Sequence, residues 1–225
     1  MIGIISAFGA SISWTYACFI WRSQTKRYKS LDINFVKNII AFLIFIPALL
    51  SFDSSIELHS LILLFLSGII GVGLGDTFYI NSLKLIGTRR TLSIETISPI
   101  IAALSGEIFI NETLSTKSWI GIIIISISIF AILSNNSNIA SKNLSKTIQK
   151  NNPYIYIFPF LSILCAVTGA LLSRMVFIDS NLSPFLTTEI RLFGAIIFLF
   201  IIKKFTINFF VSEMNSNEKN KFVCS

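Results

Sequence analysis

Seven long apolar stretches alternate with short polar segments along the chain. The apolar stretches cover residues 2–21, 35–50, 61–82, 91–110, 119–133, 154–177 and 184–202. Most of them approach the ~20 residues that a helix needs to cross a hydrocarbon core ~30 Å thick. A segment in lipid must satisfy its backbone hydrogen bonds internally, so each stretch predicts a transmembrane helix. The pattern therefore predicts an all-α, polytopic transmembrane bundle of about seven spans.

The composition supports a membrane protein and narrows its partners. Hydrophobic residues make up 53% of the chain and charged residues 13%, which is too little charge to cover a water-soluble surface. The basic residues behind the net charge of +7 lie mainly in the loops between spans. This placement favours the lipid bilayer over nucleic acid as a partner. Cys18, Cys165 and Cys224 have no paired spacing, and His59 is the single histidine. We therefore expect no metal, no cofactor and no disulfide framework.

The charges of successive loops alternate. The loops after the first, third and fifth apolar stretches are rich in Lys and Arg, whereas the loop after the second holds Asp53 and Glu57 without a basic residue. Basic loops face the cytoplasm by the positive-inside rule, which predicts an external N-terminus.

The polar residues 135–152 divide the chain. Their Asn, Ser and Lys content predicts a linker after a five-helix unit, residues 1–134. Residues 153–204 repeat the plan of the opening segment, two apolar helices with an arginine near the end of the first, and residues 205–225 form a short tail. Since five helices are an odd number, a repeated unit would be inverted in the membrane, as in many transporters.

Several short motifs then point to a family. They are GDTFY at 75–79, LKLIGTR at 83–89, SPIIAAL at 98–104, ETLS at 112–115 and WIG at 119–121. In this order and spacing, the first half resembles EamA-type proteins of the drug/metabolite transporter superfamily. The resemblance implies secondary transport of a small metabolite across a bacterial inner (plasma) membrane and a cytoplasmic N-terminus, opposite to the loop charges. It also implies two five-helix repeats, so the chain looks C-terminally truncated.

Ionisable residues inside spans are costly and are therefore functional candidates. Asp76 and Glu95 are the candidate proton-binding or substrate-binding carboxylates, because a protonatable group there can exchange a proton for substrate. Tyr79, Asn81 and Ser98 are expected as secondary polar contacts, and Trp14 as an aromatic wall. A continuous helix would place Glu95, Ser98, Ala102 and Ser105 in one polar stripe. The resemblance places this cavity between the first, third, fourth and sixth spans.

Other residues have structural interpretations. Gly68, Gly71 and Gly75 are expected to let helices pack closely, and Pro99 to kink its helix. Glu189 is expected near the beginning of its span, within reach of Arg191 or water.

Two charged residues near span ends, Arg174 and Glu112, also have structural interpretations. Arg174 is expected to extend its charge to the interface, and Glu112 to stabilise a helix N-terminus.

Three alternatives to a self-contained transporter stay open. In the first alternative, the chain is a non-functional remnant of a ten-helix transporter. In the second, it completes its cavity as a homo-oligomer. Alternatively, residues 73–76 (GLGD) match the GxGD signature of intramembrane aspartyl proteases. That chemistry requires a second aspartate that shares a proton with the first, and the other aspartates, Asp32, Asp53 and Asp179, lie in loops or at span ends.

Overall fold

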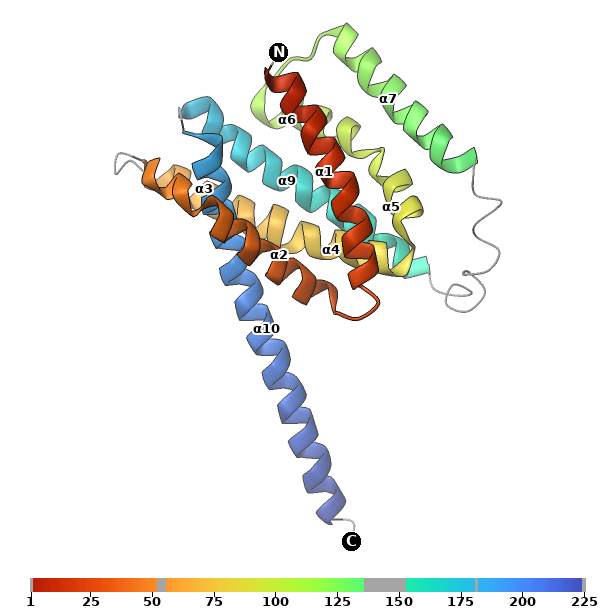
Figure 1. Ribbon diagram of the computed structural model, residues 1–225, viewed down its shortest axis with the longest axis vertical. Helices are drawn as coiled ribbons and strands as arrows, with labels where there is room; N and C mark the ends of the chain where they lie inside the picture. The colour runs from red at the N-terminus through yellow and green to blue at the C-terminus, as the bar shows by residue number, and fades with distance from the viewer. Residues whose placement is uncertain (1, 52–55, 136–152, 181, 224–225) are drawn as a thin grey trace.

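The computed structural model describes residues 2–51, 56–135, 153–180 and 182–223, and these residues form nine α-helices, two 3₁₀ turns and one π-helix, without a strand. The elements are α1 (Ile2–Gln24), α2 (Ser30–Phe45), the 3₁₀ turn η1 (Ile46–Ser51), α3 (Leu58–Ser67), the π-helix η2 (Gly68–Gly75), α4 (Asp76–Leu85), α5 (Thr88–Glu95), α6 (Ser98–Ile110), α7 (Thr116–Asn135), the 3₁₀ turn η3 (Pro153–Tyr156), α9 (Ile157–Asp179) and α10 (Pro184–Val223). The all-α class predicted from the apolar pattern is confirmed (Figure 1).

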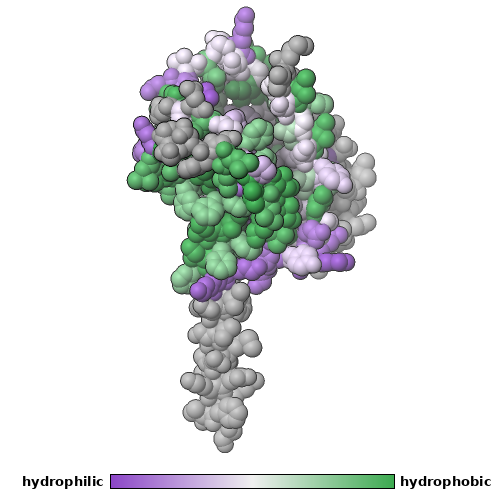
Figure 2. Space-filling model, turned by 60° about the vertical axis from the view of Figure 1, so that its left-hand side comes forward, coloured by the Kyte–Doolittle hydropathy of each residue, from purple (hydrophilic) through white to green (hydrophobic). Residues whose placement is uncertain are grey.

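The surface of the bundle is that of a membrane protein. Among the described residues, four helical spans are long and apolar enough to cross a bilayer: Leu58–Leu85, Thr88–Ile110, Tyr154–Ile178 and Pro184–Phe205. Large apolar side chains are also exposed, and Figure 2 shows hydrophobic residues filling the middle of one face with hydrophilic ones above and below. Exposing so large an apolar area to water would be unfavourable in free energy, whereas lipid acyl chains cover it without this penalty.

The continuous unit α3–η2–α4 forms the centre of the bundle and packs against both α9 and α10. Glycines permit this approach. A Cβ atom on Gly68 would lie 2.0 Å from the carbonyl oxygen of Arg191, and one on Gly169 would lie 2.7 Å from the Cα atom of Gly71. The helices therefore meet backbone to backbone, and α9 and α10 are integral to the core.

Two of the predicted spans depart from a regular α-helix in their interior. The third contains η2, whose wider i→i+5 turns are rare and often mark functional sites. The fourth is interrupted at Thr96 and Ile97, between α5 and α6, and Pro99 is the second residue of α6. The polar stripe expected on the fourth span assumed a continuous helix, so this break separates Glu95 from Ser98.

The last helix, α10, is 40 residues long and extends away from the other helices (Figure 1). It continues through residue 204, where the expected second repeat ends and the expected tail begins. Most of the expected linker, residues 136–152, lies outside the described residues.

Candidate functional site

A charged pair lies at the centre of the candidate site. Lys37 of α2 forms an ion pair with Asp76, the first residue of α4, and their side chains are 21% and 19% exposed. The Lys37 ammonium also lies 5.2 Å from the centre of the Trp21 ring, within the range of a cation–π interaction. Asp76, predicted as a candidate carboxylate, is thus provided with a counter-charge from a neighbouring helix.

A second polar residue of α2, Asn34, contacts the end of the π-helix beside this pair. Nδ2 of Asn34 lies 2.9 Å from the carbonyl oxygen of Val72, 3.0 Å from that of Gly73 and 3.0 Å from Oγ1 of Thr77. An amide has two hydrogens, so it donates to two of these acceptors at a time. Asn34 is fully buried, and its amide adds a donor at the end of η2, where the Gly73 carbonyl oxygen also accepts a hydrogen bond of 2.6 Å from Oγ1 of Thr77.

A second cation approaches Asp76 from α10. The guanidinium of Arg191 is close enough to Asp76 to interact electrostatically with it. A Cβ on Gly71 would lie 3.4 Å from Nη2 of Arg191, so the glycine leaves room for the arginine to cross η2. Lys37, Asp76 and Arg191 thus bring α2, α4 and α10 together around one carboxylate.

An aromatic wall lies beside the charged pair, between α1 and α4. The ring of Tyr79 lies 5.5 Å from that of Trp14 and 6.4 Å from that of Trp21, and the two tryptophans are 5.4 Å apart. The Tyr79 hydroxyl and Sγ of Cys18 form a hydrogen bond of 3.0 Å. Since Tyr79 is 2% exposed, this wall links α1 firmly to α4.

Glu95, the last residue of α5, faces this wall. Its carboxyl group interacts electrostatically with Tyr79 and with Asp76. The structure therefore brings together Trp14, Asp76, Tyr79 and Glu95. We refer to Lys37, Asp76, Tyr79, Glu95 and Arg191 as the central polar cluster.

Two further candidate residues lie outside this cluster. Asn81 faces α2, where its Oδ1 accepts a long hydrogen bond of 3.4 Å from Oγ of Ser30. Ser98 begins α6 beyond the helix break and is half-buried. Neither residue contributes to the contacts that join Asp76, Tyr79 and Glu95.

Glu189 was expected within reach of Arg191 or water, and the structure shows no contact with Arg191. Both oxygens of Glu189 and Nε of Arg191 are buried without a hydrogen-bond partner among the described residues. Residues two apart on a helix point about 200° apart, so Arg191 faces Asp76 while Glu189 faces the opposite side. The side chain of Arg174, expected to extend its charge to the interface, is 57% exposed and binds Glu112 with Nη2 2.7 Å from Oε1.

The sequence interpretation missed the contributions of α2. Lys37 and Asn34 were not recognised as site residues, although a signal was present. Ser30, Asn34 and Asn38 are spaced by four positions, and Lys37 follows Asn34 by three, which places their side chains on one helix face. A polar stripe on a membrane helix indicates a face turned toward protein.

The cluster suits charged or polar solutes. It holds two acids and two bases, so the sum of its formal charges is close to zero when all four are ionised. The cluster can therefore exchange internal ion pairs for bonds to a solute without leaving a charge alone in the membrane. Among the described residues, no three His, Cys, Asp or Glu side chains lie together in a way that would hold a metal ion.

The fold and this cluster define an integral, multi-pass membrane protein whose bundle encloses charged residues. Residues 1–134 match the EamA-like transporter family, and the chain belongs to that family. It is also 25% identical over 134 residues to a protein of Archaeoglobus fulgidus described as an uncharacterized transporter. The aligned region covers 59% of this chain and 48% of the relative. The chain thus spans about half the length of the curated relative that it matches. No solved structure matches it.

Proposed function

We propose that this chain acts as a secondary transporter that moves a small metabolite across the membrane by alternating access, with the central polar cluster as its binding site. Asp76 and Glu95 are the proton-binding or substrate-binding carboxylates, and Trp14 and Tyr79 form the aromatic wall. The observation that carries the proposal is the position of Glu95, whose carboxyl group interacts electrostatically with both Asp76 and Tyr79 inside the bundle.

Irregular helices next to the cluster support alternating access. Asp76 follows directly on the π-helix, and Glu95 directly precedes the break at residues 96 and 97. Transporters commonly place their sites at such discontinuous helices, where backbone conformation changes at low cost. Two carboxylates at the two irregular points give substrate or proton binding a direct influence on helix geometry.

The two units of the chain fit this proposal. Residues 1–134 are proposed as the first five-helix repeat, and residues 153–204 as two helices of a second. The helices α9 and α10 pack on η2 beside Asp76, so both units contribute to the site. A homo-oligomer that supplies further helices is one way to complete the cavity.

The test compares the metabolites of cells that produce the wild-type chain with those of cells carrying an empty vector. Mass spectrometry of the medium and of the cell contents should reveal at least one small metabolite whose distribution changes with the wild-type chain. Glu95→Gln and Asp76→Asn should remove that change. Glu107→Gln provides the matched control, because Glu107 lies on the same span but is exposed.

The other outcomes distinguish the alternatives. No difference between wild type and empty vector would overturn the transport proposal and favour a non-functional remnant. Cleavage of a model transmembrane peptide that Asp76→Asn abolishes would favour the aspartyl protease. A protease dyad requires two adjacent aspartates. Here Asp76 is paired with Lys37, and Oδ1 of Asp32 lies 2.8 Å from Nζ of Lys203, so both ion pairs argue against that enzyme.

A further inference from the structure

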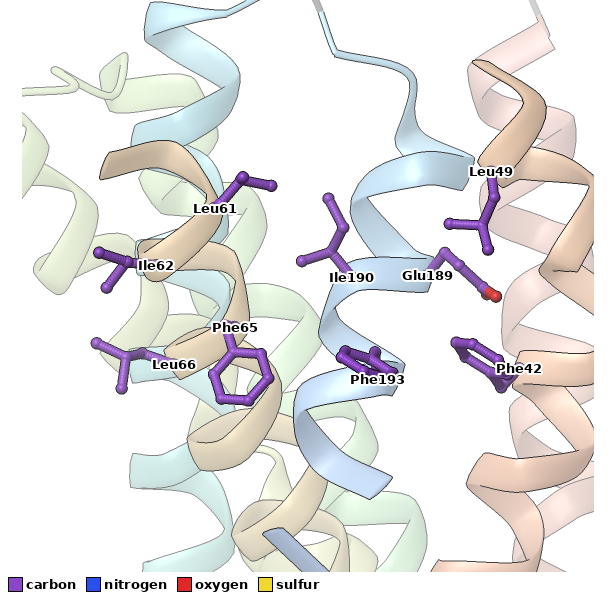
Figure 3. Close-up of a pocket in the computed structure, with 9 residues that line it drawn as sticks. All are labelled: Phe42, Leu49, Leu61, Ile62, Phe65, Leu66, Glu189, Ile190 and Phe193. Atoms are coloured by element: carbon purple, nitrogen blue, oxygen red, sulfur yellow. The ribbon is translucent and has the colours of Figure 1, made fainter. Parts of the chain in front are cut away.

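A second polar group is buried on the side of α10 that faces away from the central polar cluster. A groove of about 540 Å³ lies between α2–η1, α3 and α10. Its lining is apolar except for one residue, Glu189 (Figure 3). We refer to this pocket as the Glu189 groove.

The walls of the Glu189 groove are aromatic at one end. The rings of Phe42 and Phe193 lie 6.0 Å apart, and those of Phe65 and Phe193 lie 6.4 Å apart. Figure 3 shows these three rings below Glu189, whose carboxylate points from α10 toward α2 and lies between Leu49 and Phe42. The aromatic faces offer contact area and a favourable environment for a cation.

Glu189 is fully buried, and neither of its oxygens has a hydrogen-bond partner among the described residues. The charged groups of the surrounding elements are directed elsewhere. Lys37 of α2 binds Asp76, Arg191 of α10 also faces Asp76, and His59 of α3 is exposed in the first turn of that helix. An isolated carboxylate in an apolar site is costly, so the groove lacks one positive charge.

We propose that the Glu189 groove binds a hydrophobic amine, with its ammonium group on Glu189 and its apolar body against Phe42, Phe65 and Phe193. One positive charge matches the one carboxylate. The other lining residues have no polar side chain that could bind a second polar group of the ligand. This site is separate from the central polar cluster and does not depend on the proposed transport activity.

The same chemistry argues against a zwitterionic lipid as the occupant. An ethanolamine headgroup supplies an ammonium, but it also carries a phosphate that needs a donor or cation nearby. The groove lining contains none. A single acyl chain would fill the groove but would leave Glu189 without a counter-charge.

The experiment measures binding to the full chain in nanodiscs made of phosphatidylcholine. Equilibrium dialysis with labelled adamantylamine is compared with adamantanol, a neutral molecule of the same shape. We expect saturable binding of the amine and at least about tenfold weaker binding of the alcohol, a difference of about 1.4 kcal/mol. Glu189→Gln should reduce amine binding to the level of the alcohol, and Glu107→Gln should leave it unchanged.

A second variant guards against a folding defect in Glu189→Gln. Leu49→Trp places a large ring at the mouth of the groove and leaves the carboxylate in place, so it should also weaken amine binding. Circular dichroism and size-exclusion chromatography check that each variant keeps its helices and its size. Equal affinity for amine and alcohol, or undiminished amine binding in Glu189→Gln and Leu49→Trp, would overturn the proposal.

Two other occupants have their own signatures, and either would overturn the proposal. Native mass spectrometry that finds phosphatidylethanolamine retained by the wild type, lost in Glu189→Gln and not displaced by adamantylamine would identify a lipid. A wild-type dimer that Glu189→Gln converts to a monomer would identify a second copy of the chain.

Discussion

The central polar cluster and the Glu189 groove lie on opposite sides of α10 and treat charge in opposite ways. In the cluster, Asp76 has Lys37 beside it and Arg191 nearby. In the groove, Glu189 is fully buried without a partner among the described residues. Burying a compensated pair and burying a lone charge have very different free energies, so one site is stable as it is and the other favours a ligand.

The largest expected effect comes from Gly68→Ala, which disturbs both sites at once. A Cβ at this position would lie 2.0 Å from the carbonyl oxygen of Arg191, so α10 must move away from α3 and η2. We expect the free energy of unfolding to fall by about 3 kcal/mol, the upper range for overpacking. Denaturant unfolding in micelles, followed by tryptophan fluorescence, measures it. Gly9→Ala is the control, because among the described residues no atom outside its own helical turn lies within 4 Å of its Cβ position. Equal stability of both variants would contradict the close packing at Gly68.

Removing the cation of the central pair has the next largest effect. Lys37→Met leaves Asp76 with only the more distant Arg191, and we expect a loss of about 2 kcal/mol, between the values for exposed and buried pairs. The double variant Lys37→Met/Asp76→Asn should recover part of this loss, because no lone carboxylate remains. A double-mutant cycle in the same unfolding assay measures the coupling. Additive effects of the two substitutions would show that the residues do not interact.

Asn34→Leu tests the polar support of the π-helix. The substitution removes the amide donor of the Val72 carbonyl in a buried site, whereas the Gly73 carbonyl keeps its hydrogen bond from Oγ1 of Thr77. The loss should cost about 1–3 kcal/mol. Asn81→Leu is a matched control, since Asn81 has one long contact of 3.4 Å. If both substitutions destabilise the protein equally, Asn34 has no special role at η2. Hydrogen exchange of the η2 amides provides a local measurement.

The smallest effect on stability is expected for Glu189→Gln. No ion pair or hydrogen bond is lost, and a neutral amide is less costly in an apolar groove than a carboxylate. The free energy of unfolding should therefore stay within about 0.5 kcal/mol of the wild type or rise. This result beside a clear loss in Lys37→Met would establish the contrast between the two sites. A loss as large as that of Lys37→Met would show that Glu189 has a partner in the protein.

The sequence predicted the helices better than their interruptions. Length and hydropathy depend on neighbouring residues, so the seven apolar stretches correspond closely to the helical segments. The π-helix at Gly68–Gly75 had no such local signal, because its glycines are equally compatible with a regular packed helix. The break before Ser98 came with a local signal, Pro99, although a proline fixes neither the position nor the extent of a break.

The candidate site was predicted only in part. Asp76 and Glu95 attracted attention because acids are rare in membrane helices, and the structure brings the Glu95 carboxyl group into electrostatic contact with both Asp76 and Tyr79. Lys37 was missed because it lies near the beginning of an apolar stretch, where a lysine normally reaches the headgroups. Its partner is 39 positions away, and no local pattern reports such a pairing.

By itself, the sequence determined the solvent, the helical class and the family, because each depends on composition, segment length or short motifs. Only the tertiary structure decided which charges are compensated. Asp76 and Glu189 are both acids within apolar helices, yet one faces a lysine and the other faces phenylalanines. The electrostatic free energy of a carboxylate depends on the groups within a few ångströms of it, and the packing of distant helices places those groups.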